Sequence, residues 1–91
     1  MRYQIEMSTR FKKDYKLAQK RGYNMNLLKE VIDILANGEQ LPEKYLDHPL
    51  MGEYKGMREC HIEPDWLLVY RKEKERLILA LARTGTHSDL F

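Results

Sequence analysis

Residues 59–70, ECHIEPDWLLVY, place a histidine, a Pro-Asp-Trp turn and an apolar run directly after one another. The apolar run that begins at Trp66 is rich in β-forming residues and is bounded by a proline and by charged residues, which is typical of a strand covered on both faces. Pro64 cannot donate to a sheet and disfavours helix in the preceding residue, so the chain is expected to turn here. We therefore predict a central strand, with His61 and Asp65 gathered close to its start.

Apolar periodicity and capping residues predict the other elements. In chain order these are a strand at residues 3–7, a helix from Ser8 or Thr9 to Gly22, a helix from Asn24 to Gly38, and strands at 54–62, 66–71 and 77–83. Residues 39–52 are expected to form a loop, and residues 86–91 a short polar tail. Because the last three strands have short connections, they must pair antiparallel. The predicted fold is α+β, β-α-α-β-β-β, with a helical hairpin on one face of an antiparallel sheet and the other face at least partly open.

The size and composition of the chain limit the classes of protein it can be. Its 91 residues are expected to form one domain, residues 1–91. Cys60 is the only cysteine, so an internal disulfide and a cysteine zinc motif are excluded, and a reducing cytoplasm is the expected location. The longest apolar run, residues 77–82, is far shorter than the roughly 20 residues that span a membrane. No membrane partner is therefore expected.

Basic residues concentrate in one segment, although the formal net charge of the whole chain is only +2. Residues 8–21 contain six basic residues and one acidic residue. Because this segment is predicted to be helical, its basic face is a candidate surface for nucleic acid. From charge alone, an ordinary solvated outer face explains the pattern equally well.

All three histidines fall in predicted turns or at strand ends. In an antiparallel meander, the end of the second strand, the start of the third and the end of the fourth meet at one edge of the sheet. The residues expected at that edge are His61, Asp65, Trp66, Arg83 and His87. His48 taken singly is more simply explained as a surface histidine.

The residue types at this edge favour general acid–base catalysis, because one imidazole can accept a proton while another donates one. Arg83 can stabilise charge on a phosphate, and Trp66 and Phe91 can stack on unpaired bases. We therefore predict an RNA-cleaving site in which the 2′-hydroxyl is the nucleophile. The histidines form no HxH or HExxH pair, so no metal ligand and no cofactor is predicted. A tryptophan at the start of a central strand is more often a core residue than a platform for a base, so Trp66 can equally be buried. Arg83 is expected to lie on the same face of its strand as the leucines that precede it.

Three segments carry a resemblance to a known family. They are FKKDYKLAQKRGYNMNLL at residues 11–28, DHPLMGEYKGMRECHIEPDWLLVY at 47–70 and RTGTHSDLF at 83–91. On these segments the chain resembles the YafQ-type toxins of the RelE/ParE superfamily, which are the toxin halves of bacterial type II toxin–antitoxin pairs. The resemblance implies a RelE-like, microbial ribonuclease-like fold and an endoribonuclease (mRNA interferase) that cuts mRNA on the translating ribosome.

The resemblance also implies partners and site residues. It implies an antitoxin, typically of the ribbon-helix-helix type, and operator DNA that is bound only through the toxin–antitoxin complex. Carried over by position, the implied catalytic residues are His48, His61, Asp65 and His87, and the implied RNA-binding residues are Arg83, Trp66 and Phe91. We expect His87 to be the general acid, Asp65 with His61 to form the base side, and His48 to position the phosphate or share the base role.

Two alternatives stay open at this point. ParE-type toxins of the same superfamily poison DNA gyrase and are not nucleases, and they would not need the histidine cluster. The chain can also be a pure interaction module whose open sheet face binds only the antitoxin; its expression without the antitoxin would then be harmless.

Overall fold

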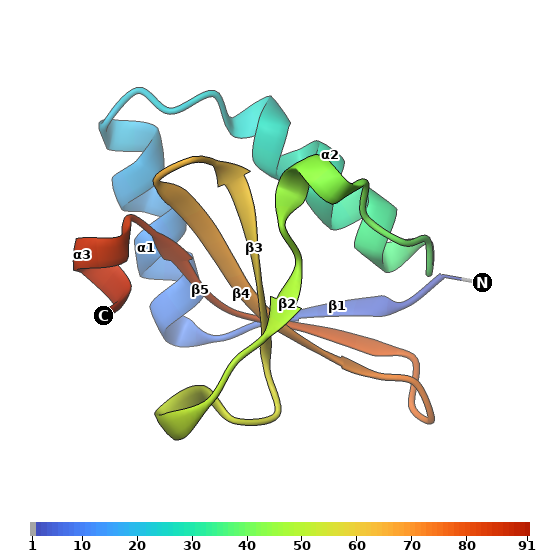
Figure 1. Cartoon of the computed structure of the whole chain (residues 1–91). Coiled ribbons are helices and arrows are strands. Elements are labelled where there is room, and N and C mark those ends of the chain that lie inside the picture. Colours follow the sequence, from blue (N-terminus) through green and yellow to red (C-terminus); the bar gives the residue numbers. More distant parts are fainter. Residues whose placement is uncertain (1) are drawn as a thin grey trace.

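The computed structural model describes residues 2–91 and has the predicted α+β architecture (Figure 1). Its strands are β1 (Gln4–Met7), β2 (His48–Pro49), β3 (Arg58–Glu63), β4 (Trp66–Glu73) and β5 (Ile78–Gly85). Its helices are α1 (Thr9–Lys20), α2 (Met25–Ala36), the 3₁₀ turns η1 (Glu43–Tyr45) and η2 (Gly52–Tyr54), and α3 (His87–Leu90). No helix within these described residues is long and apolar enough to cross a membrane.

The five strands form one sheet in the order β1-β5-β4-β3-β2. The last three strands form the expected antiparallel meander, and β2 adds to it antiparallel to β3. β1 pairs with β5 in parallel, so the sheet is mixed and not wholly antiparallel. Two helices separate β1 from the meander, and a connection of that length allows a parallel partner.

The helix ends lie where local chemistry predicts them. Ser8 precedes α1, and its Oγ accepts a hydrogen bond from the backbone N–H of Phe11 at 2.9 Å. After α1, Gly22 adopts a φ of 81°, and the N–H of Tyr23 reaches back to the carbonyl of Ala18 at 3.1 Å. These contacts terminate α1 with a Schellman motif, which favours glycine at the left-handed position.

The sheet has a large core on one face and a small one on the other. The large core packs Cys60, Trp66, Leu68 and Tyr70 of the sheet against apolar residues that include Phe11, Leu28, Val31 and Leu35 of the helices. The small core consists of Leu67, Val69 and Leu90, with Leu50, Tyr54, Met57 and Ala82 packed around it. Side chains alternate between faces along a strand, so β4 contributes to both cores. α3 covers only part of the second face.

Three local predictions differ from the structure. The strand expected from residue 54 begins at Arg58, because Gly52–Tyr54 form η2. His48, expected in a loop, pairs with Glu59 in the sheet. The expected polar tail is α3, which begins after Thr86 with a capping box formed with Asp89. A four-residue helix is too short to show apolar periodicity, so only its capping residues could have predicted it.

A β-bulge changes the face on which Arg83 lies. Val69 is paired with Arg83, but the next residue of β4, Tyr70, is paired with Leu81. Directly paired residues share a face, so Arg83 lies on the face of Val69 and not on that of Leu81. The expectation that Arg83 shares the face of the preceding leucines is therefore wrong, since one extra residue reverses the alternation.

Candidate active site

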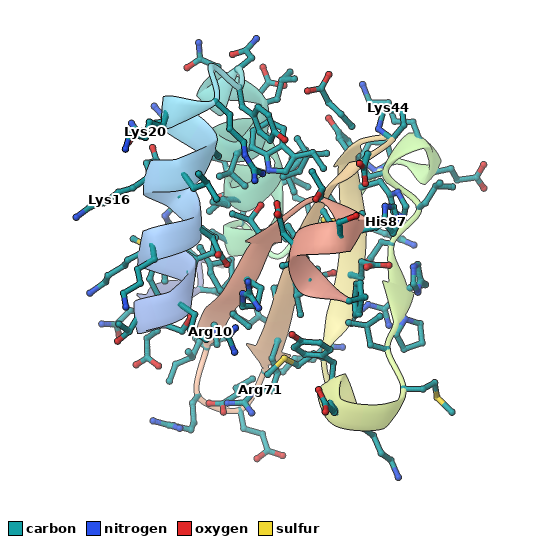
Figure 2. All side chains as sticks on the ribbon, turned by 90° about the vertical axis from the view of Figure 1, so that its left-hand side faces the viewer. Arg10, Lys16, Lys20, Lys44, Arg71 and His87 are labelled. Carbon is teal, nitrogen blue, oxygen red and sulfur yellow. The ribbon has the colours of Figure 1, made fainter. Side chains whose placement is uncertain are left out.

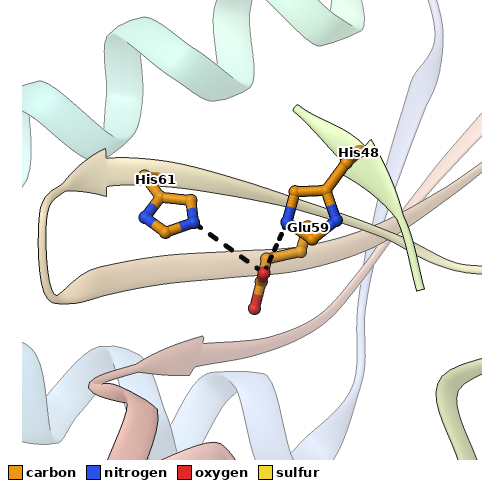
Figure 3. Close-up of side chains that lie close together, drawn as sticks. All are labelled: His48, Glu59 and His61. Atoms are coloured by element: carbon orange, nitrogen blue, oxygen red, sulfur yellow. Dashed lines mark ion pairs between the residues drawn. The ribbon is translucent and has the colours of Figure 1, made fainter. Parts of the chain in front are cut away.

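Two histidines and a buried glutamate converge on the face of the sheet opposite α2 (Figure 3). Nε2 of His48 lies 2.8 Å from Oε2 of Glu59, and Nε2 of His61 lies 3.8 Å from the same oxygen. The backbone produces this arrangement, because His48 is paired with Glu59 across the β2–β3 ladder and His61 follows Glu59 by two residues on one strand. We call these three residues the HEH cluster.

Glu59 is the site residue that sequence reasoning missed. Its side chain is only 7% exposed, and its Oε1 is buried without a hydrogen-bond partner among the described residues. A buried carboxylate without full pairing is costly, so such a residue points to a functional requirement. The available signal was its spacing of two from His61, which puts both side chains on the same face of a strand.

A second histidine–carboxylate pair lies beside the HEH cluster. Oδ1 of Asp65 accepts hydrogen bonds from the backbone N–H of His87 at 2.9 Å and from its ring Nδ1 at 2.6 Å. These bonds hold the pKa of Asp65 below its ordinary value, because they stabilise the carboxylate. The rings of His61 and His87 have centroids 5.7 Å apart, so the two groups adjoin. Asp65 therefore pairs with His87 and not, as expected, with His61.

The position of His87 depends on how α3 is anchored. Asp89 accepts a hydrogen bond from the backbone N–H of Thr86 at 2.9 Å. It also forms an ion pair with Arg21, at the end of α1, at 2.7 Å. The Arg21 guanidinium and the Thr86 amide hold the pKa of Asp89 well below its usual range. Gly85 is also required here, since a Cβ at this position would lie 2.8 Å from Oδ2 of Asp89. Figure 1 shows the result, with α3 (red) beside α1 (blue).

Arg83 and Phe91 both lie on the face of this site. Nε of Arg83 donates to Oδ2 of Asp14 at 2.7 Å, and this pair raises the pKa of the guanidinium. Its side chain is only 11% exposed, so Arg83 is already engaged in the free protein. Phe91 is exposed and packs edge-on against Tyr54, with ring centroids 5.6 Å apart. Phe91 is thus free to contact a ligand on its outer face.

Trp66 does not belong to the site. It is 2% exposed within the large core, where it packs edge-on against Tyr23 with ring centroids 4.9 Å apart. Its Nε1 donates to the buried hydroxyl of Thr84 at 2.9 Å. The expectation that Trp66 stacks on a base is therefore wrong, because the indole lies on the helix-covered face and is almost wholly buried.

The basic segment forms an exposed face of α1. Figure 2 shows Arg10, Lys16 and Lys20 along this helix, with His87 on the neighbouring α3. All six basic residues of the segment are exposed: Arg10, Lys12, Lys13, Lys16, Lys20 and Arg21. We call this set the α1 basic face. Arg21 is committed to Asp89, so the other five supply most of its field.

The fold and the site together describe a small α+β protein with a candidate acid–base site of histidines and carboxylates. A family model described as "Bacterial toxin of type II toxin-antitoxin system, YafQ" matches residues 3–91. The chain belongs to this family.

Individual relatives agree with this assignment. The mRNA interferase toxin YafQ of Escherichia coli strain K12 is 49% identical over 88 residues, which cover 96% of this chain and 94% of that protein. Among solved structures, the toxin in the E. coli DinJ-YafQ toxin-antitoxin complex matches with a TM-score of 0.91 at 47% identity, covering 100% of this chain and 99% of that chain. A metal-bound toxin from Helicobacter pylori matches with a TM-score of 0.91 at 47% identity, covering 100% of both chains.

Proposed function

We propose that this toxin cleaves mRNA on the translating ribosome by metal-independent acid–base catalysis. That it is an mRNA endoribonuclease follows from its family and from its 49% identity with an mRNA interferase. The observation that supports the mechanism is the adjacency of two histidine–carboxylate groups, the HEH cluster and the Asp65–His87 pair, whose nearest rings are 5.7 Å apart. One group can then accept a proton while the other donates one.

The HEH cluster supplies the base side of the reaction. Its histidines remove the proton of the RNA 2′-hydroxyl, and the resulting oxygen attacks the adjacent phosphorus. Oε2 of Glu59 lies close to Nε2 of both rings, so it stabilises the positive charge that the accepted proton brings. This role moves Glu59 into the place on the base side that Asp65 was expected to fill.

His87 is the general acid. Because Asp65 accepts the hydrogen on Nδ1, Nε2 is the ring nitrogen left to carry the transferable proton. As the bond between phosphorus and the 5′-oxygen breaks, His87 donates this proton to the departing oxygen. The products are a 2′,3′-cyclic phosphate and a 5′-hydroxyl, and the balance needs no further reactant.

Arg83 and Phe91 bind the substrate. The guanidinium of Arg83 lies on the catalytic face and can contact a phosphate oxygen when RNA competes with Asp14. Phe91, 62% exposed, offers its free ring face to an unpaired base.

The α1 basic face docks the toxin on ribosomal RNA. Five exposed cations beside α3 bring the backbone of a structured RNA close to His87. Binding through such a face should weaken steeply as salt is added, and a flat salt response would contradict this role. Since mRNA and ribosomes are its targets, we place the toxin in the cytoplasm.

The partner that silences the toxin is an antitoxin, as DinJ accompanies YafQ in the E. coli complex. We expect it to be of the ribbon-helix-helix type and to bind operator DNA, so the toxin contacts DNA only through this complex.

Mapping of mRNA 5′ ends by primer extension tests the proposal. Programmed ribosomes are treated with the purified toxin and, in parallel, with His87→Ala, Glu59→Gln and a control variant, Glu63→Gln, which changes an exposed carboxylate on the same strand. We expect new ends at codon-defined positions with the toxin and the control. The cleavage rate should fall about 10²–10⁴-fold with His87→Ala.

Two outcomes would overturn parts of this proposal. Cleavage by His87→Ala within a few-fold of the unmodified toxin would refute the acid assignment. An absence of new ends from folded toxin would instead favour gyrase poisoning or pure antitoxin binding, whereas equal cleavage of naked mRNA would refute the dependence on the ribosome.

A further inference from the structure

We propose that a pocket between η1 and β3 binds the base of the nucleotide on the 5′ side of the cut, while Phe91 binds the base on its 3′ side. This assignment rests on the proposed function, since the roles of the HEH cluster and His87 decide which nucleotide lies where. The RNA then crosses the site in one direction, and the pocket is a subsite that determines specificity.

A cavity of about 430 Å³ lies between η1, α2 and the end of β3, and we call it the η1 pocket. Figure 1 shows η1 (green) beside α2, at the end of the sheet where β3 turns into β4. The lining of the pocket includes Leu27, Glu30, Lys44, Tyr45, Leu46 and His61. Sites for small organic ligands usually have volumes of about 300–1,000 Å³, so the η1 pocket has room for a nucleobase.

His61 joins the η1 pocket to the catalytic groups. Its ring lines the pocket, and its Nε2 lies 3.8 Å from Oε2 of Glu59 in the HEH cluster. The ring of His87, whose centroid is 5.7 Å from that of His61, does not line the pocket. The η1 pocket therefore adjoins the base side of the reaction and not the acid side.

Phe91 lies at the acid side instead. It follows α3 directly, and its backbone N–H donates to the carbonyl of His87 at 2.8 Å. Its exposed ring packs against Tyr54, and neither of these two aromatic residues lines the η1 pocket. The site thus offers two separate places for a base, one beside each proton-transfer group.

The chemistry of the cut decides which base takes which place. The attacking 2′-hydroxyl belongs to the nucleotide on the 5′ side of the cut, and the departing 5′-oxygen belongs to the nucleotide on the 3′ side. The HEH cluster takes a proton from the first group and His87 gives a proton to the second, so the two sugars lie in that order. Each base is attached to its own sugar, and it therefore enters the place next to the same histidine.

The walls of the η1 pocket suit a flat ring. Tyr45 and Ile62 are each 8% exposed and form buried parts of the lining, whereas Leu46 is 59% exposed and forms an open apolar part. Leu46 has a φ of 49°, a left-handed conformation that strains a leucine and that proteins keep mainly where a ligand site requires it. An unpaired base would cover this exposed apolar surface with one of its faces.

Charged side chains allow the η1 pocket to distinguish one base from another. The ammonium of Lys44 can only donate hydrogen bonds and the carboxylate of Glu30 can only accept them, and both residues are exposed. Nζ of Lys44 lies 5.1 Å from the centroid of the Tyr45 ring, which keeps it near the pocket. Because the four bases differ in the donors and acceptors on their edges, such groups favour some bases over others.

Cleavage of matched mRNAs on programmed ribosomes tests this assignment. One set varies only the nucleotide on the 5′ side of the main cut, and a second set varies only the nucleotide on its 3′ side. Leu46→Asn removes the open apolar wall, and asparagine tolerates the left-handed backbone, so the fold should be kept. We expect the ratio of kcat/KM between the best and the worst 5′ nucleotide to fall about tenfold or more, with the 3′ ratio unchanged.

Two further variants complete the experiment. Phe91→Ala should do the reverse and reduce only the 3′ ratio. Leu17→Asn, at an exposed leucine of α1 outside the η1 pocket, is the matched control and should change neither ratio. Thermal unfolding of every variant checks that it is folded.

Three results would overturn the assignment. Leu46→Asn could leave both ratios unchanged, or it could reduce the 3′ ratio instead of the 5′ ratio. An equal loss of cleavage over all four 5′ nucleotides is the third, because the pocket would then bind something other than that base, such as ribosomal RNA.

NMR with an uncleavable dinucleotide decides the site even if the toxin cleaves nothing. A dinucleotide whose first sugar lacks the 2′-hydroxyl can bind at saturating concentration but cannot be cut. Isotope-filtered spectra should show contacts from the first base to the Leu46 methyls and from the second base to the Phe91 ring. These contacts without any cleavage by the toxin would refute the proposed function and keep the two base sites. No contact to Leu46, or the reverse order, would overturn the inference.

Discussion

Replacing Thr84 with valine should destabilise the protein by about 2 kcal/mol. Oγ1 of Thr84 accepts the indole N–H of Trp66 at 2.9 Å and donates to the carbonyl of Leu67 at 2.7 Å, and both side chains that form the first bond are 2% exposed. Valine has nearly the same shape, so it leaves no cavity, but it leaves the indole N–H buried without an acceptor. An orphaned buried donor costs about 1–3 kcal/mol.

Thermal and urea unfolding measure this effect. For a domain of this size, about 2 kcal/mol corresponds to a fall in Tm of about 8–16 °C. Thr9→Val, at an exposed threonine, is the matched control and should change stability by less than about 0.5 kcal/mol. An unfolding free energy of Thr84→Val within that margin of the unmodified protein would refute the reasoning.

A double-mutant cycle with Trp66→Phe connects this stability argument to function. Phenylalanine has no indole N–H, so Thr84→Val with Trp66→Phe should cost less than the sum of the single changes. Both variants should cleave ribosome-bound mRNA with unchanged KM below their unfolding temperatures. Loss of a base-stacking contact would cost about 1–3 kcal/mol of binding instead. A raised KM of Trp66→Phe with unchanged stability would show that Trp66 does contact RNA.

Three other predictions concern the anchoring of α3 and the buried thiol. Arg21→Gln should lower kcat and leave KM nearly unchanged, because it loosens the helix that positions His87. Single-turnover cleavage measures this, with Lys29→Gln, at an exposed lysine of α2, as the control. The pKa of Asp89 is lowered in the folded protein, so its carboxylate stabilises the fold at pH values above the carboxyl's ordinary pKa near 4. This stability is lost as the pH falls further. Asp89→Asn should therefore flatten the acid-unfolding curve recorded by circular dichroism. Burial raises the pKa of Cys60 to about 12, so native protein should resist iodoacetamide at pH 8 and react only when unfolded, as mass spectrometry would show.

Much of the fold was predictable from short-range signals. Ser8 and Gly22 mark the ends of α1 through contacts within four or five residues of the chain. The apolar run after Pro64 marks the central strand through its composition alone. Such signals act locally, so they identify elements without fixing which residues face each other across the sheet.

The contacts within the candidate site could not be predicted from such local signals. Glu59 looks like one more charged residue in the sequence, and only pairing with β2 places it between His48 and His61. Asp65 was expected beside His61, but the cap of α3 brings the backbone and ring of His87 to it. In both cases the deciding contact joins residues that are far apart along the chain. The contact between Asp65 and His87 also depends on the turn that begins α3, and a turn leaves no periodic pattern in the sequence.

The sequence by itself therefore determined the α+β class, the order of the main elements, and the prediction that His61, Asp65 and His87 gather at one edge of the sheet. Tertiary structure alone decided that β1 runs parallel to β5, that a bulge turns Arg83 to the face of the candidate site, and that Trp66 is buried. The physical reason is that caps and periodicity depend on neighbours within a few residues. Register, burial and the pairing of charges depend on which strands and helices pack together once the chain has folded.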